Sequence, residues 1–238
     1  MIIEGRNAVR EALNGETTID KILVAKGVQD GSLGALIEAA KDRRIRVSFV
    51  DKAVLDRESV TKHHQGVIAY ATNFDYCTLD DILQNKRGEK HFILILDEIE
   101  DPHNFGSIVR VAECMGVDGV VIGSRRQVAV TETVVKTSAG ATTYMRIAKV
   151  GNINDAIRTL KEEFITVYAL DMDGTPLQEA RLDGDIALVV GNEGKGVKPL
   201  TRKLSDGAVS IPMYGNVASL NASVAAGIAV YEANRQRK

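Results

Sequence analysis

Three polar stretches of this sequence contain most of the side chains that could do chemistry, and each follows a run of residues that is typical of a buried β-strand. They are residues Asp97–Arg110, Gly191–Val197 and Pro212–Asn221. In open α/β sheets, ligands bind outside the carboxyl ends of the strands. The three loops are therefore expected to lie close together and to form one site.

The glycine-rich loop could hold a ligand through its backbone, but not in the manner of the familiar phosphate-binding loops. It reads Gly191-Asn-Glu-Gly-Lys-Gly196, which places its glycines in the reverse order of the dinucleotide fingerprint Gly-x-Gly-x-x-Gly. The Gly-Lys-Ser/Thr of a P-loop is also missing from the sequence. A dinucleotide-dependent oxidoreductase, the default interpretation of an α/β pattern, is therefore disfavoured. Glu193 at the loop tip, taken alone, predicts only a solvated carboxylate.

The other two loops offer amide, hydroxyl and guanidinium groups that also admit ordinary structural roles. Asn104 could cap a helix, and Arg110 could be a surface arginine. Six residues on one helix are separated by about 240° around its axis, so these two would share a target only if Asn104 lay in the loop and Arg110 on the helix. Ser219 and Asn221 could likewise be no more than a helix N-cap. Taken residue by residue, the structural interpretations are favoured.

Strand and helix patterns alternate along the chain, as they do in sheets whose faces are covered by helices. In residues 1–72, short apolar runs alternate with amphipathic helices, and we expect a small α/β domain there. A mixed stretch, residues 73–89, in which Thr78 or Asp80 could cap a short helix through Leu83, is predicted to link it to residues 90–238. In residues 90–238 the alternation predicts a mostly parallel sheet. The expected helices of this second domain include Ser107–Met115 and one that begins near Asn221. The first turns of the latter consist mainly of small residues, which would let a backbone or a ligand come close.

The composition limits the classes of function. The chain has 238 residues, of which 45% are hydrophobic and 26% are charged, as in ordinary globular proteins. Its formal net charge of −2 gives no global attraction to nucleic acid. No apolar run approaches the ~18 residues of a membrane span, and the first residues lack the layout of a signal peptide. Two cysteines, and four histidines without ligand spacing, predict no metal site and suit a reducing cytoplasm.

Together the three loops form a much more specific pattern than any one of them alone. The pattern consists of Asn104 with Arg110, then Gly191–Gly196, then Ile211-Pro-Met followed by Ser219-Leu-Asn-Ala-Ser-Val-Ala. It resembles the three motifs of the SpoU/TrmH family in the SPOUT superfamily, whose members are S-adenosylmethionine-dependent enzymes that methylate the ribose 2′-hydroxyl of RNA. The resemblance spans roughly residues 92–235, and no motif position departs from the family pattern.

The resemblance implies a fold and a cofactor that periodicity could not show. Residues 1–72, which include Gly5-Arg-Asn-Ala-Val and His64-Gln-Gly-Val, would form an RNA substrate-binding domain. Residues 90–238 would form a parallel-sheet SPOUT domain with a deep trefoil knot, a feature that is very rare in proteins. S-adenosylmethionine would bind in the knot. By motif position, the cofactor-binding residues would be Gly191, Ile211 and Leu220, with Leu170 and Met213 as neighbours.

The resemblance also implies a reaction, catalytic residues and partners. The catalytic residues would be Asn104, Arg110, Glu193, Ser219 and Asn221. The protein would work as a homodimer, without a metal and in the cytoplasm, and its likeness within the family predicts a guanosine of 23S rRNA as the substrate. The alternatives are the same reaction on tRNA, and a non-catalytic RNA-binding protein of the same fold.

Arg110 is the residue that the resemblance places at the reacting hydroxyl, but its chemistry argues against its acting as the base. A guanidinium is effectively never deprotonated in a protein. We therefore expect Arg110 to grip the adjacent phosphate and to stabilise the developing alkoxide, while the proton leaves through phosphate or water. The other catalytic residues would orient Arg110 and the ribose. In the N-terminal domain, the candidates for RNA contact are Arg6, Asn7, Lys62, His63 and His64.

Overall fold

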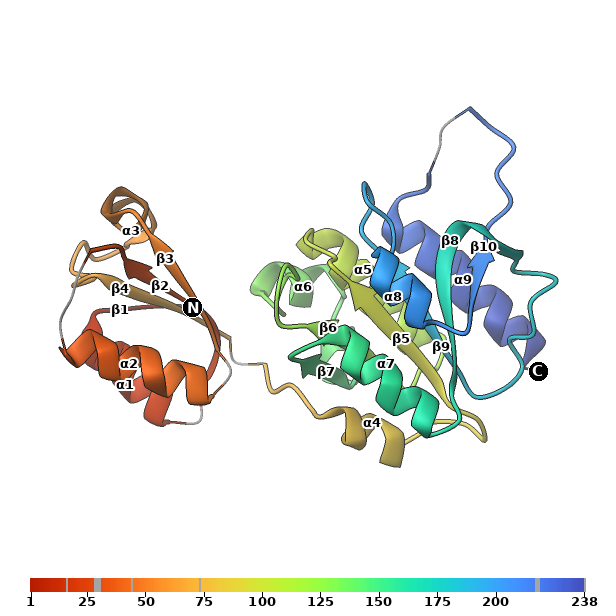
Figure 1. Cartoon of the computed structure of the whole chain (residues 1–238), viewed down its shortest axis with the longest axis horizontal. Helices are drawn as coiled ribbons and strands as arrows, with labels where there is room; N and C mark the ends of the chain where they lie inside the picture. Colours follow the sequence, from red (N-terminus) through yellow and green to blue (C-terminus); the bar gives the residue numbers. More distant parts are fainter. Residues whose placement is uncertain (16, 28–30, 44, 73, 217–218, 238) are drawn as a thin grey trace. The chain divides into compact units, whose positions relative to one another are not determined.

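The computed structural model describes residues 1–238 apart from residues 16, 28–30, 44, 73, 217–218 and 238. The chain divides into two compact units, Met1–Asp75 and Tyr76–Lys238. Each unit has its own β-sheet and its own hydrophobic core (Figure 1). Within the described ranges, no helix combines the length and the apolar character that crossing a membrane requires.

The N-terminal unit contains a four-stranded sheet with helices on both faces. Its elements are β1 (Ile2–Glu4), α1 (Arg6–Asn14), β2 (Thr18–Ala25), α2 (Gly31–Asp42), β3 (Arg46–Val50), α3 (Lys52–Glu58) and β4 (Val67–Thr72). The strands lie in the order β1-β4-β2-β3, and β4 is antiparallel to both of its neighbours. One face packs on α1 and α2 through residues such as Ile22 and Leu36, and the other packs on Leu55 of α3. This is the small α/β domain that the sequence predicts.

The C-terminal unit is built on a parallel sheet of six strands in the order β10-β8-β9-β5-β6-β7. Its elements are α4 (Leu79–Gln84), β5 (Phe92–Asp97), α5 (Pro102–Cys114), β6 (Gly119–Gly123), α6 (Glu132–Thr137), the 3₁₀ turn η1 (Ala141–Thr143), β7 (Ile147–Val150), α7 (Ile153–Glu162), β8 (Thr166–Pro176), β9 (Ile186–Gly191), α8 (Pro199–Leu204), β10 (Gly207–Ser210) and α9 (Ala222–Gln236). The predicted fold class, a small α/β domain followed by a parallel-sheet domain, is confirmed.

Helices cover both faces of the parallel sheet (Figure 1). Helix α7 packs on one face through Ile157 and Leu160, next to α4 and α8. Helices α5, α6 and α9 lie on the other face. Because both faces are covered, the central strands are almost entirely apolar, and every residue of β5 is buried, including the terminal Asp97.

The register of the strands brings the polar loops to one edge of the sheet. Asp97, the last residue of β5, pairs with Gly191, the last residue of β9. The loop that leads to α5 and the glycine-rich loop therefore begin side by side. The third polar loop follows β10, which is separated from β9 only by β8.

Helix α5 begins earlier than the sequence predicts. We expected it over Ser107–Met115, but it starts at Pro102. The side chain of Asp101 caps it by accepting a hydrogen bond from the backbone nitrogen of His103 at 3.0 Å, and a proline fits the first helical position because the N–H it lacks would be unpaired there. Asn104 consequently lies in the first turn of α5 and not in the loop that precedes it.

The stretch of residues 73–89, which we predicted to be a linker with a short helix capped by Thr78 or Asp80, contains helix α4, and its cap is Thr78. Thr78 and Asp81 form a capping box at its start, in which each side chain bonds the backbone nitrogen of the other residue. Ile82 is fully buried over Gly119, where an added Cβ would lie only 2.5 Å from the Cδ1 atom of Ile82. This part of the stretch is therefore packed into the C-terminal unit.

Two glycines of the C-terminal unit allow chain segments to touch backbone to backbone. A Cβ added at Gly191 would lie 2.2 Å from the carbonyl carbon of Gly196, and one added at Gly174 would lie 2.5 Å from the backbone nitrogen of Val209. A tightly threaded chain needs such close approaches. The trefoil knot itself stays a prediction.

Candidate active site

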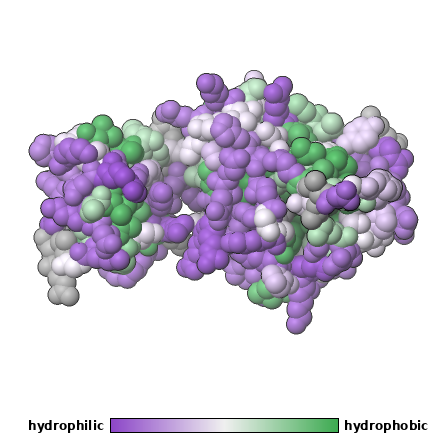
Figure 2. Space-filling model, turned by 90° about the horizontal axis from the view of Figure 1, so that it is seen from above, coloured by the Kyte–Doolittle hydropathy of each residue, from purple (hydrophilic) through white to green (hydrophobic). Residues whose placement is uncertain are grey.

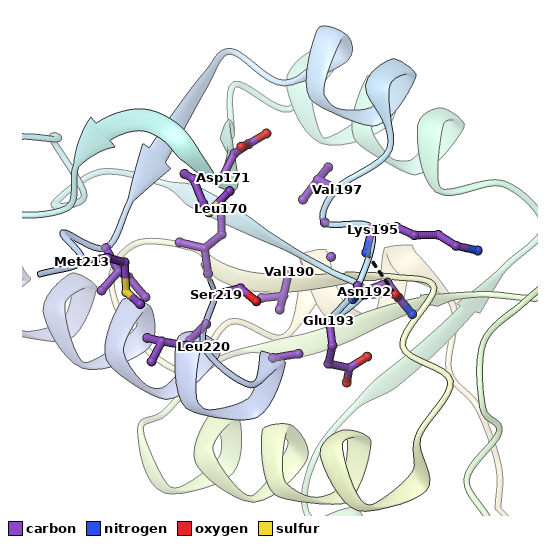
Figure 3. Close-up of a pocket in the computed structure, with 17 residues that line it drawn as sticks. Leu170, Asp171, Val190, Asn192, Glu193, Lys195, Val197, Met213, Ser219 and Leu220 are labelled. Carbon is purple, nitrogen blue, oxygen red and sulfur yellow. Dashed lines mark hydrogen bonds between the residues drawn. The ribbon is translucent and has the colours of Figure 1, made fainter. Parts of the chain in front are cut away.

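A cavity of about 350 Å³ lies at the carboxyl ends of β9 and β10, beside the middle of β8. This volume is within the range of roughly 300–1,000 Å³ that is usual for small-molecule sites. Figure 3 shows Leu170, Val190 and Leu220 directed toward a common space from three different segments. All five residues that we expect to contact the cofactor line the cavity, namely Leu170, Gly191, Ile211, Met213 and Leu220.

The glycine-rich loop forms one wall of the cavity as a closed turn. The backbone nitrogen and oxygen of Asn192 exchange hydrogen bonds with those of Gly196, at 3.2 and 2.8 Å. The side chain of Asn192 accepts a bond from the nitrogen of Gly194 at 3.0 Å and donates one to the carbonyl oxygen of Glu98 at 3.0 Å. Asn192 therefore ties the glycine-rich loop to the loop after β5. Sequence reasoning missed it, although asparagine is a typical turn-forming residue.

A cluster of ion pairs anchors the end of the same loop. The Nζ atom of Lys198 lies 2.8 Å from the carboxylate of Glu98 and 3.3 Å from that of the buried Asp97. The backbone nitrogen of Lys198 also donates to Asp97, at 3.1 Å. Burial alone would lower the pKa of Lys198, but the hydrogen bond to Glu98 and the charge of Asp97 raise the pKa above its usual value. The cation therefore stays charged and fixes the start of α8 to the end of β5.

A chain of amide hydrogen bonds joins the three polar loops. The Nδ2 atom of Asn221 donates to Oδ1 of Asn104 at 2.9 Å, and Nδ2 of Asn104 donates to the carboxylate of Glu193. Asn104 is 9% exposed, so most of its surface is removed from solvent. Asn221 also caps α9, because its Oδ1 atom accepts a bond from the nitrogen of Ser223 at 2.9 Å. Asn221 therefore caps α9 and also bonds to Asn104, and its part in catalysis stays a prediction.

The two remaining predicted catalytic residues lie in different places. Ser219 lines the cavity, and Figure 3 shows it near Val190. Arg110 is exposed on α5, about 240° around the helix axis from Asn104. Among the described residues of this chain, Arg110 makes no hydrogen bond or ion pair with Asn104, Glu193, Ser219 or Asn221. One chain thus brings four of the five residues together and leaves Arg110 on its outer surface.

The small residues at the start of α9 have two uses. Ala222 and Ala225 line the cavity, so no long side chain from α9 fills it. Gly227 faces α5, where an added Cβ would lie 3.9 Å from the Cγ2 atom of Val111. The small residues therefore keep α9 from filling the cavity and let α9 lie directly against α5, where an alanine at position 227 would still fit at an ordinary distance. Close approach of a ligand to this segment stays a prediction.

The candidates for RNA contact in the N-terminal unit divide into two kinds. Exposed or half-buried side chains that line one surface groove are Arg6, Asn7, Lys62 and His63. His64 is buried, with Nε2 at 2.9 Å from the carboxylate of Asp56 and Nδ1 accepting a bond from the backbone nitrogen of Gly66 at 3.0 Å. Both ring nitrogens are therefore engaged, and we assign His64 to holding its loop and not to contact with RNA.

The arrangement in the C-terminal unit can bind a partly apolar ligand and orient a polar group beside it. The cavity supplies aliphatic side chains and the backbone of a glycine-rich loop, while Glu193 and two amides stand at its edge. No cluster of three or more histidine, cysteine, aspartate or glutamate side chains that could hold a metal ion occurs in the part of the chain that the structure describes.

Comparison with known families assigns both units. A model of the SpoU rRNA Methylase family matches residues 91–231. A second model, described as RNA 2′-O ribose methyltransferase substrate binding, matches residues 2–77. The two matches fall on the two compact units of the structure.

Similar proteins cover nearly the whole chain. YacO of Bacillus subtilis (strain 168), whose assignment to the TrmH family of tRNA/rRNA methyltransferases is itself provisional, is 41% identical over 238 residues, which are 98% of this chain and 94% of YacO. A protein of Staphylococcus aureus (strain COL) with the same provisional assignment is 39% identical over 99% of this chain and 96% of its own.

Solved structures show the same fold. The SpoU methyltransferase AviRb from Streptomyces viridochromogenes, in complex with the cofactor AdoMet, covers all of this chain with a TM-score of 0.63, 22% identity and 90% of AviRb matched. The A. aeolicus TrmH/SpoU tRNA modifying enzyme aligns with 67% of this chain and 80% of its own, at 32% identity and a TM-score of 0.58. From the two family matches and the relatives that span it, this chain belongs to the SpoU/TrmH family of RNA methyltransferases.

Proposed function

We propose that this protein transfers a methyl group from S-adenosylmethionine to the 2′-hydroxyl of a guanosine ribose in 23S rRNA. The observation that carries the proposal is the chain of hydrogen bonds from Asn221 through Asn104 to Glu193, beside a cavity of suitable size. The two matched family descriptions, one naming rRNA and the other RNA 2′-O ribose methylation, support the substrate and the reaction. Such a substrate would be met in the cytoplasm.

The cavity suits a cofactor that is partly apolar and partly cationic. Leu170, Ile211 and Leu220 offer aliphatic surface to a flat base, and the backbone of the glycine-rich loop offers hydrogen-bonding groups. The backbone of Gly196 and Val197 fills the space that a Cβ on Gly191 would take, so the glycine lets the loop close on itself at the wall of the cavity. The Glu193 carboxylate, which also lines the cavity, would supply negative charge to a cationic cofactor held there. S-adenosylmethionine supplies a methyl group that is already activated by its sulfonium.

The protein's own residues must then prepare the hydroxyl, which is a poor nucleophile until its proton is removed. We propose that Asn104, Glu193, Ser219 and Asn221 orient the ribose through hydrogen bonds. Arg110 grips the adjacent phosphate with two parallel N–H donors and stabilises the negative charge that develops on the ribose oxygen. The proton leaves through the phosphate or a water molecule, since the guanidinium itself cannot accept it.

Arg110, which lies apart from the other four site residues in one chain, would meet them in a homodimer. Val224, Ile228 and Tyr231 recur every three or four residues on α9 and are 49%, 40% and 59% exposed, so they form an apolar stripe on the surface. Figure 2 shows hydrophobic residues gathered in part of the surface of the C-terminal unit. Because α5 packs beside α9, Arg110 lies on the same side of the sheet as this stripe. A second copy on the stripe would bring the Arg110 of each chain toward the cavity of the other.

Mixed dimers test whether the two chains share their sites. Arg110→Ala and Glu193→Ala are each expected to be inactive alone, whereas co-refolding them in equal amounts should restore about a quarter of wild-type activity, because half of the dimers would then hold one complete site. The measurement is methyl incorporation into rRNA. If Arg110 serves its own chain, every mixed dimer lacks a residue in each site and no activity returns.

Asn221→Asp separates the two roles of Asn221. Aspartate keeps the acceptor that caps α9, but it cannot donate to Asn104. We expect the free energy of unfolding to stay within about 1 kcal/mol of the wild-type value and kcat to fall at least tenfold. The control is Asn152→Asp, which changes the cap of α7 away from the cavity in the same way. Equal effects of both changes on kcat would show that the bond to Asn104 has no role in the reaction.

The same reaction on tRNA is the second candidate. The A. aeolicus enzyme, which is described as tRNA modifying, favours it. That protein covers only 67% of this chain, a share about as large as the C-terminal unit alone. Mapping 2′-O-methylated nucleotides in total RNA from cells with and without the gene decides between the two. A guanosine of 23S rRNA that loses its methyl group supports the proposal, and a loss confined to tRNA refutes the rRNA assignment.

A further inference from the structure

The residue that follows β5 has a backbone conformation that residues with a side chain rarely adopt. Glu98 has a φ of 64°, in the left-handed region that favours glycine. It is also buried, with 7% of its surface exposed. Strained residues of this kind persist only where the surrounding structure holds them, and they concentrate at functional sites. The contacts of Glu98 should therefore account for its conformation.

Ion pairs hold the side chain of Glu98. Its carboxylate lies 2.8 Å from the Nζ atom of Lys198 and 3.6 Å from the Nη1 atom of Arg126. The Nζ atom of Lys198 also lies 3.3 Å from the carboxylate of Asp97, which is 1% exposed. A buried carboxylate is costly without its cation. The pair with Lys198 therefore keeps the Glu98 side chain inward and fixes the direction of the backbone that carries it.

The backbone on both sides of Glu98 is fixed as well. Asp97 is the last residue of β5 and is paired within the parallel sheet. The backbone nitrogen of Ile99, whose side chain is fully buried, donates to Oε1 of Gln127 at 2.9 Å. The left-handed turn between these two fixed residues directs the carbonyl oxygen of Glu98 at the glycine-rich loop, where it accepts a bond from Nδ2 of Asn192 at 3.0 Å.

Asn192 connects the position of Glu98 to that of Glu193. The Oδ1 atom of Asn192 accepts bonds from the backbone nitrogens of the two residues that follow Glu193, at 3.0 and 3.3 Å. The amide of Asn192 therefore spans the tip of the loop, where Glu193 lies (Figure 3), and its other end is held by Glu98. The carboxylate of Glu193 in turn accepts the bond from Asn104. A shift of the Glu98 carbonyl oxygen would thus move the carboxylate that meets Asn104.

We propose that Glu98 is a positioning residue: its ion pair with Lys198 holds its backbone in the left-handed conformation, and this conformation places Asn192 and Glu193 at the cavity. Glu98 is not among the described residues that line the cavity, so its effect passes through the backbone of the glycine-rich loop. The consequence for methyl transfer rests on the proposed function, whereas the consequence for the loop does not.

Two variants at position 98 of the full chain separate the backbone conformation from the carboxylate. Glu98→Ala and Glu98→Gly both remove the ion pair with Lys198, but only glycine adopts a positive φ without a steric penalty. We expect Glu98→Ala to lower kcat for methyl transfer by roughly 10–100-fold, the cost of misplacing a group by about 1 Å. Glu98→Gly should restore most of that loss. Equal losses in the two variants would show that the carboxylate acts by itself and would overturn the inference.

Hydrogen–deuterium exchange provides a readout that needs neither cofactor nor RNA. The two backbone N–H groups that bond to Asn192 are protected only while its amide is held by Glu98. We expect Glu98→Ala to speed the exchange of residues 192–196 by about tenfold, and Glu98→Gly to keep the wild-type rate. Unchanged exchange in Glu98→Ala would contradict the inference even if kcat fell.

Phe164 supplies the matched control. It also has a positive φ, of 59°, but it is 92% exposed and precedes β8, at the opposite end of the parallel sheet from the cavity. Phe164→Ala and Phe164→Gly should both leave kcat and the exchange of residues 192–196 as in the wild type. Faster loop exchange in Phe164→Ala, equal to that in Glu98→Ala, would mean a general loosening of the unit and would refute a specific role of Glu98.

The two readouts distinguish a failure of the inference from a failure of the proposed function. If the position-98 variants differ in loop exchange as expected while the wild type methylates no RNA, the proposed function fails and the inference stands. If the wild type methylates RNA while Glu98→Ala and Glu98→Gly behave alike in both measurements, the inference fails and the proposed function stands.

Discussion

Replacement of Arg110 by alanine is expected to lower kcat for RNA methylation by about 10²–10³-fold, the usual cost of removing one preorganised group that stabilises developing negative charge. Binding of S-adenosylmethionine should not change, because Arg110 lies outside the cavity that holds the predicted cofactor residues. The fold should also persist, since the side chain is exposed. The measurements are single-turnover methyl transfer and calorimetric titration of the cofactor.

Two further variants test whether the loss comes from the paired donors of Arg110 and not from the removal of any surface arginine. Arg110→Lys keeps the charge but loses the two parallel donors, and we expect it to recover little of the lost rate at any pH. Nearly full turnover of the lysine variant at high pH would rule out the bidentate role. Arg158→Ala removes an exposed arginine from α7, which covers the opposite face of the sheet, and should leave kcat unchanged.

Gly191→Ala is expected to disrupt the cofactor cavity and to destabilise the C-terminal unit together. The new Cβ would lie 2.2 Å from the carbonyl carbon of Gly196 and 2.3 Å from the nitrogen of Val197, so the backbone itself must move. Overpacking of this kind costs typically 1–3 kcal/mol, and we expect the free energy of unfolding to fall by the upper part of that range. Cofactor affinity should fall at least tenfold, because the displaced loop is a wall of the cavity.

Gly194→Ala is the matched control for stability. It lies in the same loop, but its added Cβ would meet only the side-chain oxygen of Asn192, at an ordinary distance of 3.7 Å. Denaturant unfolding should therefore separate the two alanines, with a loss at Gly191 and little change at Gly194. Equal midpoints for both would show that the close contact of Gly191 with Gly196 does not constrain the loop.

The parts of the fold that could be predicted are those with strong local signals. The apolar run of β5 predicts a buried strand, and the amphipathic pattern of α7 predicts a helix. The glycine-rich loop is recognised by its composition. The sequence missed β1 and β7, which have three and four residues, because so short a strand exists only through its partner. A local sequence pattern does not show which distant strand a segment will pair with.

The start of α5 shows why the candidate site could be only partly predicted. Residues 102–106 look like a polar loop, and the helix that they form is set by the Asp101 cap and the proline after it. Because Asn104 and Arg110 both lie on α5, they are about 240° apart around its axis. This separation argues against a site in which both residues come from the same chain. That Asn104 would bond to both Glu193 and Asn221 depends on three strands ending at one edge, which no spacing along the chain reveals.

The measurement that tests the account most directly is methyl transfer from labelled S-adenosylmethionine to unmethylated rRNA by the purified protein, followed by digestion to nucleosides and mass spectrometry. We expect a single product, 2′-O-methylguanosine. A transcript with one 2′-deoxyguanosine at the mapped position should accept no methyl group. A methyl group on a base, or transfer that persists with the 2′-deoxy transcript, would contradict the central claim that this site acts on a ribose hydroxyl.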